Sequence, residues 1–198
     1  MDRQITSVHA TVDMLRLPVD VRGLQESCVG RTIADVRRRG KYIIVELSDT
    51  SCLLMHLGMT GAFRVCPEST SLGVHERVFW SLSDGNAWRF EDIRRFGSVQ
   101  TSILPAPGGV PACLDHLGPE PLSNAFDATY LAQATFGRKQ PIKALIMDQR
   151  TVVGVGNIYA NEALFRSGIH PGRQSGRIGP ARLDALATNT KQVLEEAI

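Results

Sequence analysis

The chain has 198 residues, of which 43% are hydrophobic and 21% charged, and these values are typical of a globular protein with a buried core. This length allows one large domain or two small ones. No apolar stretch approaches the ~20 residues that a membrane-spanning helix needs, and the opening residues contain no apolar segment typical of a secretory signal. The net charge of +2 is too small to indicate a nucleic-acid partner by itself. We therefore expect a cytoplasmic protein without a membrane partner.

The four cysteines are scattered along the chain. They form no C-x-x-C pair, and the histidines show no spacing typical of zinc ligands. We expect the cysteines to be reduced, buried thiols, as is usual in the cytoplasm. The sequence therefore predicts no metal site within these residues. The cysteines are Cys28, Cys52, Cys66 and Cys113.

Residues 1–104 read as short strands separated by turns. Asp84-Gly85 lies between two apolar stretches and is suited to the positive φ angles of a tight hairpin. Only residues 19–27 look helical in this half. The pattern predicts an antiparallel β-sandwich over residues 1–104. The most clearly marked strands are 41–47, 52–55, 78–82 and 87–90.

Residues 105–122, PAPGGVPACLDHLGPEPL, contain too much proline and glycine for regular structure, so we expect them to link two domains. Beyond them, residues 123–198 show helical patterns. The last helix is expected to begin at Gly179-Pro180, because proline is favoured in a first helical turn. The sequence thus predicts an α+β fold in which a β-sandwich precedes a helical domain. The expected helices are 127–134, 141–147, 158–167 and 180 onwards.

Basic residues gather in three places although the net charge is small. The clusters could line one groove that follows nucleic-acid phosphates, but each alone is more typical of a solvated face. Composition therefore permits nucleic-acid binding without establishing it. The clusters are residues 37–41, Arg94 with Arg95, and Arg138, Lys139 and Lys143.

A glycine-rich turn, TVVGVGN, connects two helical patterns at residues 151–157. A dinucleotide-binding fingerprint is excluded, because Tyr159 stands where its third glycine belongs and a helix rather than a strand precedes the turn. Free N–H groups at the start of the following helix, near Asn157, can hold a phosphate. A packing corner between two helices explains the same spacing equally well. Both interpretations remain open at this point.

Two further segments place unusual residues on turns. In HLGMTG, residues 56–61, Met59 lies between glycines. A methionine near a strand end usually enters the core, but an exposed one can wedge between DNA bases. In DIRRFG, residues 92–97, Arg94 and Phe96 fit either a salt-bridged strand end or a cation and ring that fill the space left by an extruded base.

Taken together, five segments resemble the formamidopyrimidine-DNA glycosylase family. They are HLGMTG, DIRRFG, HLGPEPL, DQRTVVGVGNIYANE and GIHP, in the family's order, and the resemblance runs from about Leu15 to His170. It implies DNA base-excision repair by a bifunctional glycosylase and AP lyase. Such an enzyme removes oxidised purines, namely 8-oxoguanine and formamidopyrimidines, and cleaves the strand through a Schiff base. The implied partner is double-stranded DNA with an oxidised purine or an abasic site, bound by a monomer at the bacterial nucleoid.

The resemblance also implies roles for individual residues. Met59, Arg94 and Phe96 match the family's wedge, which fills the gap and touches the orphaned cytosine. Gly156 and Tyr159 fall in its helix–two-turn–helix element. The wedge residues and GVGNIY resemble the purine-specific branch rather than the pyrimidine-specific one. Residues that match phosphate-contacting positions, or a lysine of the helical domain, are Lys41, His56, His75, Arg95, Lys143 and Asn157.

Two features of the family have no match in these residues. The family begins with a Pro-Glu pair, whose proline amine attacks C1′ of the sugar while the glutamate handles protons, whereas this sequence begins Met-Asp-Arg. The family's C-terminal finger, which holds one structural zinc through four cysteines, has no counterpart before Ile198. We therefore expect no catalytic residue in this chain beyond a supporting Lys41, and no cofactor. A fragment of an active enzyme is favoured over a catalytically inactive relative that binds damaged DNA.

Overall fold

The computed structural model describes residues 3–197. The chain divides into two compact units, Met1–Asp115 and His116–Ile198, and each has its own hydrophobic core. The division falls inside residues 105–122, the segment in which the sequence predicts a link.

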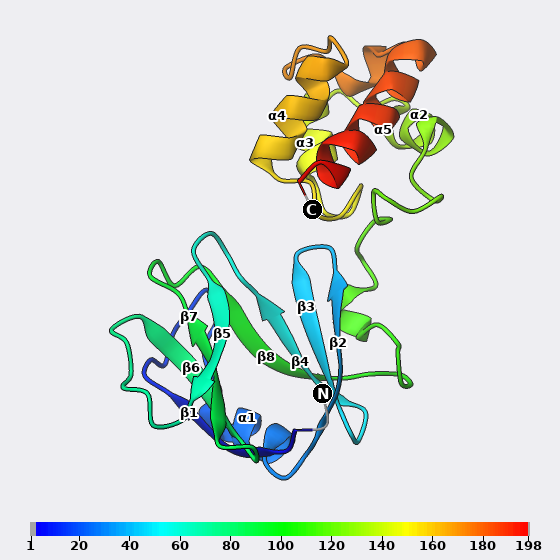
Figure 1. The fold of residues 1–198 in the computed structure, drawn as a ribbon. Helices are drawn as coiled ribbons and strands as arrows, with labels where there is room; N and C mark the ends of the chain where they lie inside the picture. The colour runs from blue at the N-terminus through cyan, green and yellow to red at the C-terminus, as the bar shows by residue number, and fades with distance from the viewer. Residues whose placement is uncertain (1–2, 198) are drawn as a thin grey trace. The chain divides into compact units, whose positions relative to one another are not determined.

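The first unit is built from two four-stranded sheets in which neighbouring strands run antiparallel. The strand order is β1-β6-β7-β5 in one sheet and β2-β3-β4-β8 in the other. The two sheets face each other (Figure 1). The predicted β-sandwich and the α+β fold class are thus confirmed. The strands are β1 (Ile5–Ala10), β2 (Ile33–Arg39), β3 (Tyr42–Leu47), β4 (Ser51–His56), β5 (Ala62–Pro67), β6 (Glu76–Leu82), β7 (Asn86–Glu91) and β8 (Ser98–Ile103).

Apolar side chains from both sheets fill the space between them. Val8 and Trp80 come from one sheet, Val45 and Leu53 come from the other, and all four are buried in a single cluster. A buried side chain of this size stabilises the fold by roughly 1.5–3 kcal/mol relative to an exposed one. The core therefore makes the sandwich a stable support for the loops that leave its strands.

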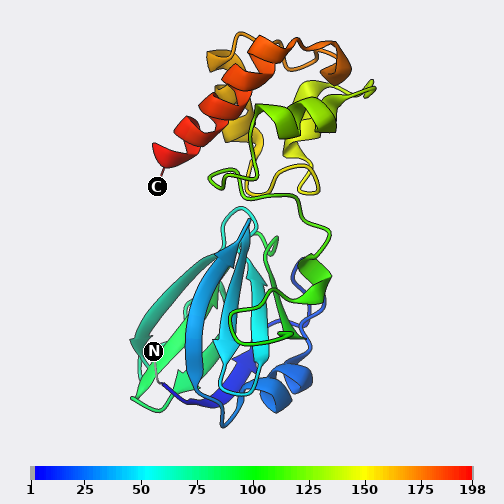
Figure 2. The ribbon, with the colours of Figure 1, turned by 90° about the vertical axis from the view of Figure 1, so that its right-hand side faces the viewer.

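Helix α1 (Val21–Cys28) lies at one end of the sandwich and packs against β1 (Figure 2). The Asp20 carboxylate caps it by accepting the N–H of Gly23 at 2.9 Å. Leu24 and Cys28 form the buried face of the helix. The helix predicted at residues 19–27 is confirmed, with bounds shifted by one or two residues.

The turn between β6 and β7 differs from the expectation of positive φ angles at both Asp84 and Gly85. Gly85 alone of the two has a positive φ, of 79°. The Asp84 carboxylate instead accepts the N–H of Asn86 at 3.1 Å. Residues 83–85 thus form a three-residue loop whose glycine takes the left-handed position, a common hairpin connection.

The cysteines are less uniformly buried than the sequence suggests. Cys28 and Cys52 are buried, and desolvation raises the pKa of each thiol to about 11. Cys66 is half-buried, and Cys113 is exposed on the short 3₁₀ helix of the linking segment. Among residues 3–197, no group of three or more His, Cys, Asp or Glu side chains could hold a metal ion. The residues described therefore do not fit the zinc finger that the resemblance implies for the family.

Within residues 116–197 the structure shows four α-helices, and each predicted helix is confirmed with its start shifted by at most one residue. Helix α5 packs against both α4 and α2, and α3 packs against α4 (Figure 2). No helix in residues 3–197 combines the length and apolar composition needed to cross a membrane. The helices are α2 (Ala128–Thr135), α3 (Ile142–Met147), α4 (Asn157–Arg166) and α5 (Pro180–Glu195), with 3₁₀ helices η1 (Ala112–Leu114) in the first unit and η2 (Ser175–Arg177) in the second.

Candidate nucleic-acid interface

Strand pairing brings the two wedge segments of the β unit together. His56 at the end of β4 pairs with Ser98 at the start of β8, so the loop after β4 and the loop before β8 leave the sheet side by side. A Cβ atom on Gly58 would lie 2.5 Å from the carbonyl carbon of Phe96, and one on Gly97 would lie 2.7 Å from the His56 carbonyl oxygen. The two loops therefore pack backbone against backbone, which only glycine allows at these positions.

Asp92 fastens these loops to each other. It is fully buried, and its carboxylate accepts the hydroxyl of Thr60 at 2.6 Å and the N–H of Gly97 at 2.8 Å. A longer bond of 3.3 Å comes from the N–H of Arg94. Because a buried carboxylate is costly unless it is hydrogen-bonded, these three donors fix its place and hold both loops in one conformation.

The fixed loops direct Met59, Arg94 and Phe96 outward. Met59 is 70% exposed and Phe96 is 45% exposed, so neither enters the core. The Arg94 guanidinium carbon lies 4.7 Å from the centre of the Phe96 ring, a cation–π arrangement. Arg95, between them, has a φ of 58°, which is unusual for a residue other than glycine. The core interpretation of Met59 is therefore wrong, and the exposed positions are those that a wedge requires.

Lys41 and His56 lie beside these loops. Gly40 and Lys41 form the two-residue turn between β2 and β3, with Gly40 at a φ of 57° in the place that a type II′ hairpin reserves for glycine. The next residue, Tyr42, pairs with His56, which places the turn close to the end of β4. Burial lowers the pKa of Lys41.

His56 is held as a neutral hydrogen-bond donor. Its Nδ1 accepts the N–H of Gly58 at 2.9 Å, so the ring proton resides on Nε2. Burial lowers the pKa of His56, and the positive charges of Arg16 and Lys41 lower it further. Arg16 also donates its backbone N–H to the Gly97 carbonyl at 3.0 Å. An Nε2–H group on a ring that is influenced by two positive charges is well suited to a phosphate oxygen.

His75 joins the same surface from the loop between β5 and β6. Its carbonyl accepts the N–H of Asp92 at 3.0 Å, so this loop meets the loop that carries Arg94. The buried carboxylate of Glu76 stabilises this loop, since it pairs with Arg89 on β7 and accepts the N–H of Gly73 at 3.0 Å. The structure thus brings together all the predicted site residues of the β unit, namely Lys41, His56, Met59, His75, Arg94, Arg95 and Phe96.

The glycine-rich turn of the helical unit is organised by Gln149. Its side-chain oxygen accepts the N–H of Gly154 at 2.9 Å, and its side-chain nitrogen donates to the Met147 and Val155 carbonyls. Gly154 has a φ of 80°, which reverses the chain before α4. Gly156 precedes α4, and within the described residues no side chain caps that helix. Its first N–H groups are therefore available to an anion.

The remaining predicted residues lie around this turn. Asn157 is the first residue of α4 and is exposed, whereas Tyr159 is half-buried against the helical core. Lys143 is half-buried on α3, and its N–H bonds to the Pro171 carbonyl at 3.2 Å. The structure thus places Lys143, Gly156, Asn157 and Tyr159 within the helical unit.

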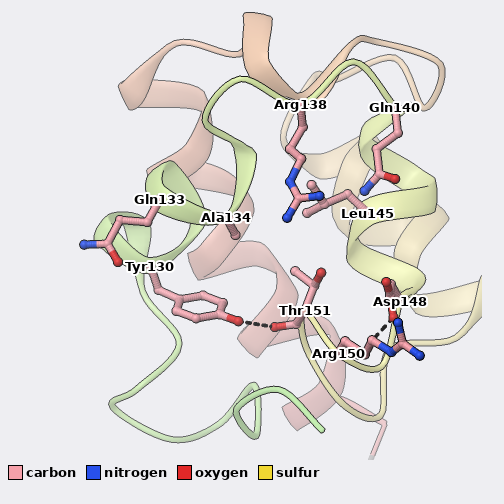
Figure 3. A pocket seen from close by; sticks show the side chains of 9 residues that line it. All are labelled: Tyr130, Gln133, Ala134, Arg138, Gln140, Leu145, Asp148, Arg150 and Thr151. Carbon is pink, nitrogen blue, oxygen red and sulfur yellow. Dashed lines mark hydrogen bonds between the residues drawn. The ribbon is translucent and has the colours of Figure 1, made fainter. Parts of the chain in front are cut away.

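A polar cavity of about 490 Å³ adjoins the start of the same turn (Figure 3). The Tyr130 hydroxyl donates to the Thr151 carbonyl at 2.6 Å, and burial raises the pKa of Tyr130, so the phenol stays a donor. Figure 3 shows Arg138 and Gln140 pointing into the cavity. The bond between Tyr130 and Thr151 connects α2 to the turn and supports it in addition to Gln149. The lining residues are Tyr130, Gln133, Ala134, Arg138, Gln140, Leu145, Asp148, Arg150 and Thr151.

Comparison with known proteins identifies the family. The formamidopyrimidine-DNA glycosylase N-terminal domain matches residues 1–99, and the H2TH domain of the same glycosylases matches residues 117–198. A formamidopyrimidine-DNA glycosylase of Shewanella halifaxensis is 42% identical over 198 residues, which cover 100% of this chain and 71% of that protein. The chain belongs to the formamidopyrimidine-DNA glycosylase family.

Further members and solved structures agree with this assignment. The formamidopyrimidine-DNA glycosylase of Halorhodospira halophila is 46% identical over 199 residues, covering 99% of this chain and 72% of that protein. Lactococcus lactis Fpg in complex with DNA that contains an abasic site is 25% identical, with a TM-score of 0.87 over 100% of this chain and 72% of that one. A complex of the same protein with Fapy-dG DNA gives the same TM-score, covering 73% of that chain. The family predicted from five sequence segments is thus confirmed.

Within this family framework, four residues that organise the interface escaped sequence reasoning. Asp92 and Gln149 lie inside recognised segments, as the first residue of DIRRFG and the second of DQRTVVGVGN, so their polar character was a usable signal. Arg16 lies outside those segments, and so does Arg77 on β6, whose Nε donates to the Asp92 carbonyl at 2.8 Å. They reach the interface only through the folded structure, and no local pattern marks them.

Proposed function

We propose that this chain binds duplex DNA that carries an oxidised purine or an abasic site, and that it serves base-excision repair of such damage. One observation carries the proposal: two loops locked together by Asp92 hold Met59, Arg94 and Phe96 outward on the β-sandwich. The names of its relatives and the DNA in the Lactococcus lactis Fpg complexes support the same class of substrate.

The exposed apolar side chains suit insertion into a base stack. Met59 and Phe96 are already in contact with solvent, so stacking between bases would bury them at no cost to the protein core. Arg94, held over the Phe96 ring, offers a planar set of donors to the edge of a base that has lost its partner. Because extruding a base costs a few kcal/mol and least at damaged sites, such a wedge favours damaged DNA.

The phosphate contacts come from different chemical groups in the two units. In the β unit they are the Lys41 ammonium and the ring N–H of His56 and of His75. In the helical unit they are the Lys143 ammonium and the N–H groups at the start of α4, next to Asn157. Contacts of this kind release counterions from DNA, so the affinity should fall steeply with rising salt.

For catalysis, we propose that residues 1–198 alone bind damaged DNA without excising the base. The nucleophilic amine and the acid that the family resemblance implies form a Pro-Glu pair, whereas residues 1–3 are Met-Asp-Arg. Lys41 contributes by holding a phosphate near the lesion. Burial lowers the pKa of Lys41, which makes it a candidate for a substitute nucleophilic amine.

The binding test compares two duplexes that differ at one position, a stable abasic-site analogue opposite cytosine or a normal guanine. We expect tighter binding to the abasic duplex, and we expect the Kd of both to rise steeply with salt. Equal affinities would contradict the wedge. Absence of salt-dependent binding to either duplex would contradict the proposed function as a whole.

The catalytic test is borohydride trapping on a duplex with 8-oxoguanine opposite cytosine. We expect no covalent complex from residues 1–198, and a complex once a P-E-L-P-E segment precedes them. A complex from residues 1–198 alone would contradict the proposal, because Met1 or a lysine such as Lys41 would then be the nucleophile. No complex from either form, with damage-specific binding intact, would favour the catalytically inactive relative.

Two finer assignments belong to the same proposal. We place the protein at the bacterial nucleoid, because its ligand is chromosomal DNA and its named relatives are bacterial. We also propose that DNA binding by these residues requires no metal. Binding that is unchanged by a chelator would agree with this, and loss of binding would contradict it.

A further inference from the structure

The side chain of the buried arginine Arg77 directs its hydrogen bonds to the loops of the candidate interface. It lies on β6 with 7% of its surface exposed. Its Nε donates to the Asp92 carbonyl at 2.8 Å, and one terminal nitrogen donates to the Val74 carbonyl at 3.2 Å. The other terminal nitrogen lies 3.1 Å from Nδ1 of His75. One side chain therefore joins the His75 loop to the loop that presents Arg94 and Phe96.

The contact between Arg77 and His75 fixes the tautomer of the imidazole. A guanidinium has only donors, so Nδ1 of His75 must be the acceptor. The ring proton then resides on Nε2, the nitrogen that is left to meet a ligand. His56 has the same tautomer through a different donor, the N–H of Gly58 at 2.9 Å. Both interface histidines therefore offer an Nε2–H group.

Arg77 differs from the other arginines of this sheet in its partners. Arg64 and Arg89 both pair with the carboxylate of Glu76. Among residues 3–197, Arg77 has no carboxylate within salt-bridge distance, and its hydrogen bonds end on carbonyls and an imidazole. A buried guanidinium without a counterion is costly. Its charge adjoins the surface where a DNA phosphate is expected, which would compensate part of that cost.

We infer that Arg77 is a positioning residue for DNA binding: it holds His75 in the Nε2–H tautomer and fastens its loop to the wedge loop. The inference rests on the proposed function, because the Nε2–H group is directed at a phosphate of the bound duplex. Arg77 itself acts through His75 and does not touch the DNA.

The tautomer is measured first, in the free protein, by two-bond ¹H–¹⁵N correlation of the histidine rings, with the His75 signals identified by their loss in His75→Gln. We expect a pure Nε2–H pattern for His75 in the unmodified chain and a tautomer mixture in Arg77→Lys. Lysine keeps the charge but cannot bond to three acceptors in one plane. Arg64→Lys is the matched control, since Arg64 bonds to Glu76 on the same sheet and should leave the pattern unchanged.

Affinity for the abasic duplex is measured next. We expect Arg77→Lys to raise the Kd about tenfold, the effect of one lost phosphate hydrogen bond, and to change it less than about twofold in a His75→Gln background. An unchanged tautomer and Kd in Arg77→Lys would overturn the inference, as would a tenfold loss that persists without His75. If the unmodified chain bound no duplex, the proposed function would fail, while the tautomer measurement would still decide the role of Arg77. Should Arg77→Lys fail to fold, Arg77→Gln, which keeps one NH₂ group as donor, takes its place in both measurements.

Discussion

The wedge loops of the β unit and the glycine turn of the helical unit are both proposed to contact DNA, but they are held in different ways. Gly58 and Gly97 bring two backbones into direct contact, and Asp92 bonds to both loops from a fully buried position. The turn before α4 is held by the side chains of Gln149 and Tyr130, and a Cβ atom on Gly154 would meet nothing within 4 Å.

This difference matches the role that we propose for each surface. A wedge must resist the stacked bases that it separates, so its support has to be rigid. A helix start that binds a phosphate needs only its N–H groups and an accessible position. We therefore propose that packing determines the specificity of the β unit, whereas backbone donors determine the general affinity of the helical unit.

The same substitution at a glycine of each unit tests this comparison most strongly. Gly58 and Gly154 have positive φ angles of 65° and 80°. In Gly58→Ala the new methyl group also meets the Phe96 backbone, so we expect the free energy of unfolding to fall by about 3 kcal/mol or more. In Gly154→Ala we expect only the backbone strain, about 1–2 kcal/mol.

Denaturant unfolding can distinguish the two effects. Both tryptophans, Trp80 and Trp88, lie in the β unit, so their fluorescence reports on that unit, while helical circular dichroism reports mainly on the other. Equal losses for the two variants would mean that the contact between the wedge loops adds no rigidity.

Replacement of the Asp92 carboxylate, which anchors both wedge loops, is the next strongest test. In Asp92→Asn the amide group must point at least one N–H toward the N–H groups that the carboxylate now accepts. We expect a loss of about 2–3 kcal/mol in stability, because buried donors are left unpaired, and a reduced preference for abasic over normal duplex. Gln149→Leu should cost about 1 kcal/mol, since water can reach the half-buried turn, and should leave the preference unchanged. Comparable losses of preference in both variants would contradict the division of roles.

Two side-chain deletions separate specificity from affinity at a smaller scale. Phe96→Ala should lower the preference for abasic duplex about tenfold, since stacking on a base contributes roughly 1–3 kcal/mol, without changing the salt dependence.

Lys143→Gln should weaken binding to both duplexes equally and reduce the slope of log K against log salt by about 1. A Lys143→Gln variant that loses preference at constant slope would reverse the assignment.

The edge strands are the part of the two sheets that the sequence did not mark individually. The four strands marked individually correspond to β3, β4, β6 and β7, which are the central strands of the two sheets. Central strands pair on both sides and carry long apolar runs, which can be read locally. Edge strands such as β5, with Arg64 and Pro67, mix polar residues into the alternation and discourage further pairing. Their place in the sheet is a tertiary property.

The candidate site divides in the same way. Met59, Arg94 and Phe96 could be selected because family segments carry them, and the structure shows how they are exposed. Arg16 meets Gly97 through a contact between residues about 80 positions apart, and Arg77 reaches Asp92 from a neighbouring strand. Only the fold brings these supporting groups to the site, so no spacing in the sequence could reveal them.

The smallest expected effect concerns the protonation of His56. Burial and the charges of Arg16 and Lys41 lower its pKa in the folded protein, so the unfolded chain takes up a proton more readily. The neutral ring therefore contributes stability above the usual histidine pKa of about 6.5, and this contribution is lost as the pH falls through the folded pKa. The difference in unfolding free energy between the unmodified chain and His56→Gln should accordingly shrink between pH 8 and pH 5.

DNA binding should show the opposite sign at the same residue. A phosphate beside His56 favours the charged ring and raises its pKa in the complex relative to the free protein. Proton uptake then accompanies binding, so the affinity for the abasic duplex should increase as the pH falls from 7.5 toward 6 at constant ionic strength. In His56→Gln this part of the pH dependence should disappear, while that from other groups remains. If the two proteins show the same pH dependence of Kd, His56 meets no phosphate and its neutral tautomer serves only the Gly58 turn.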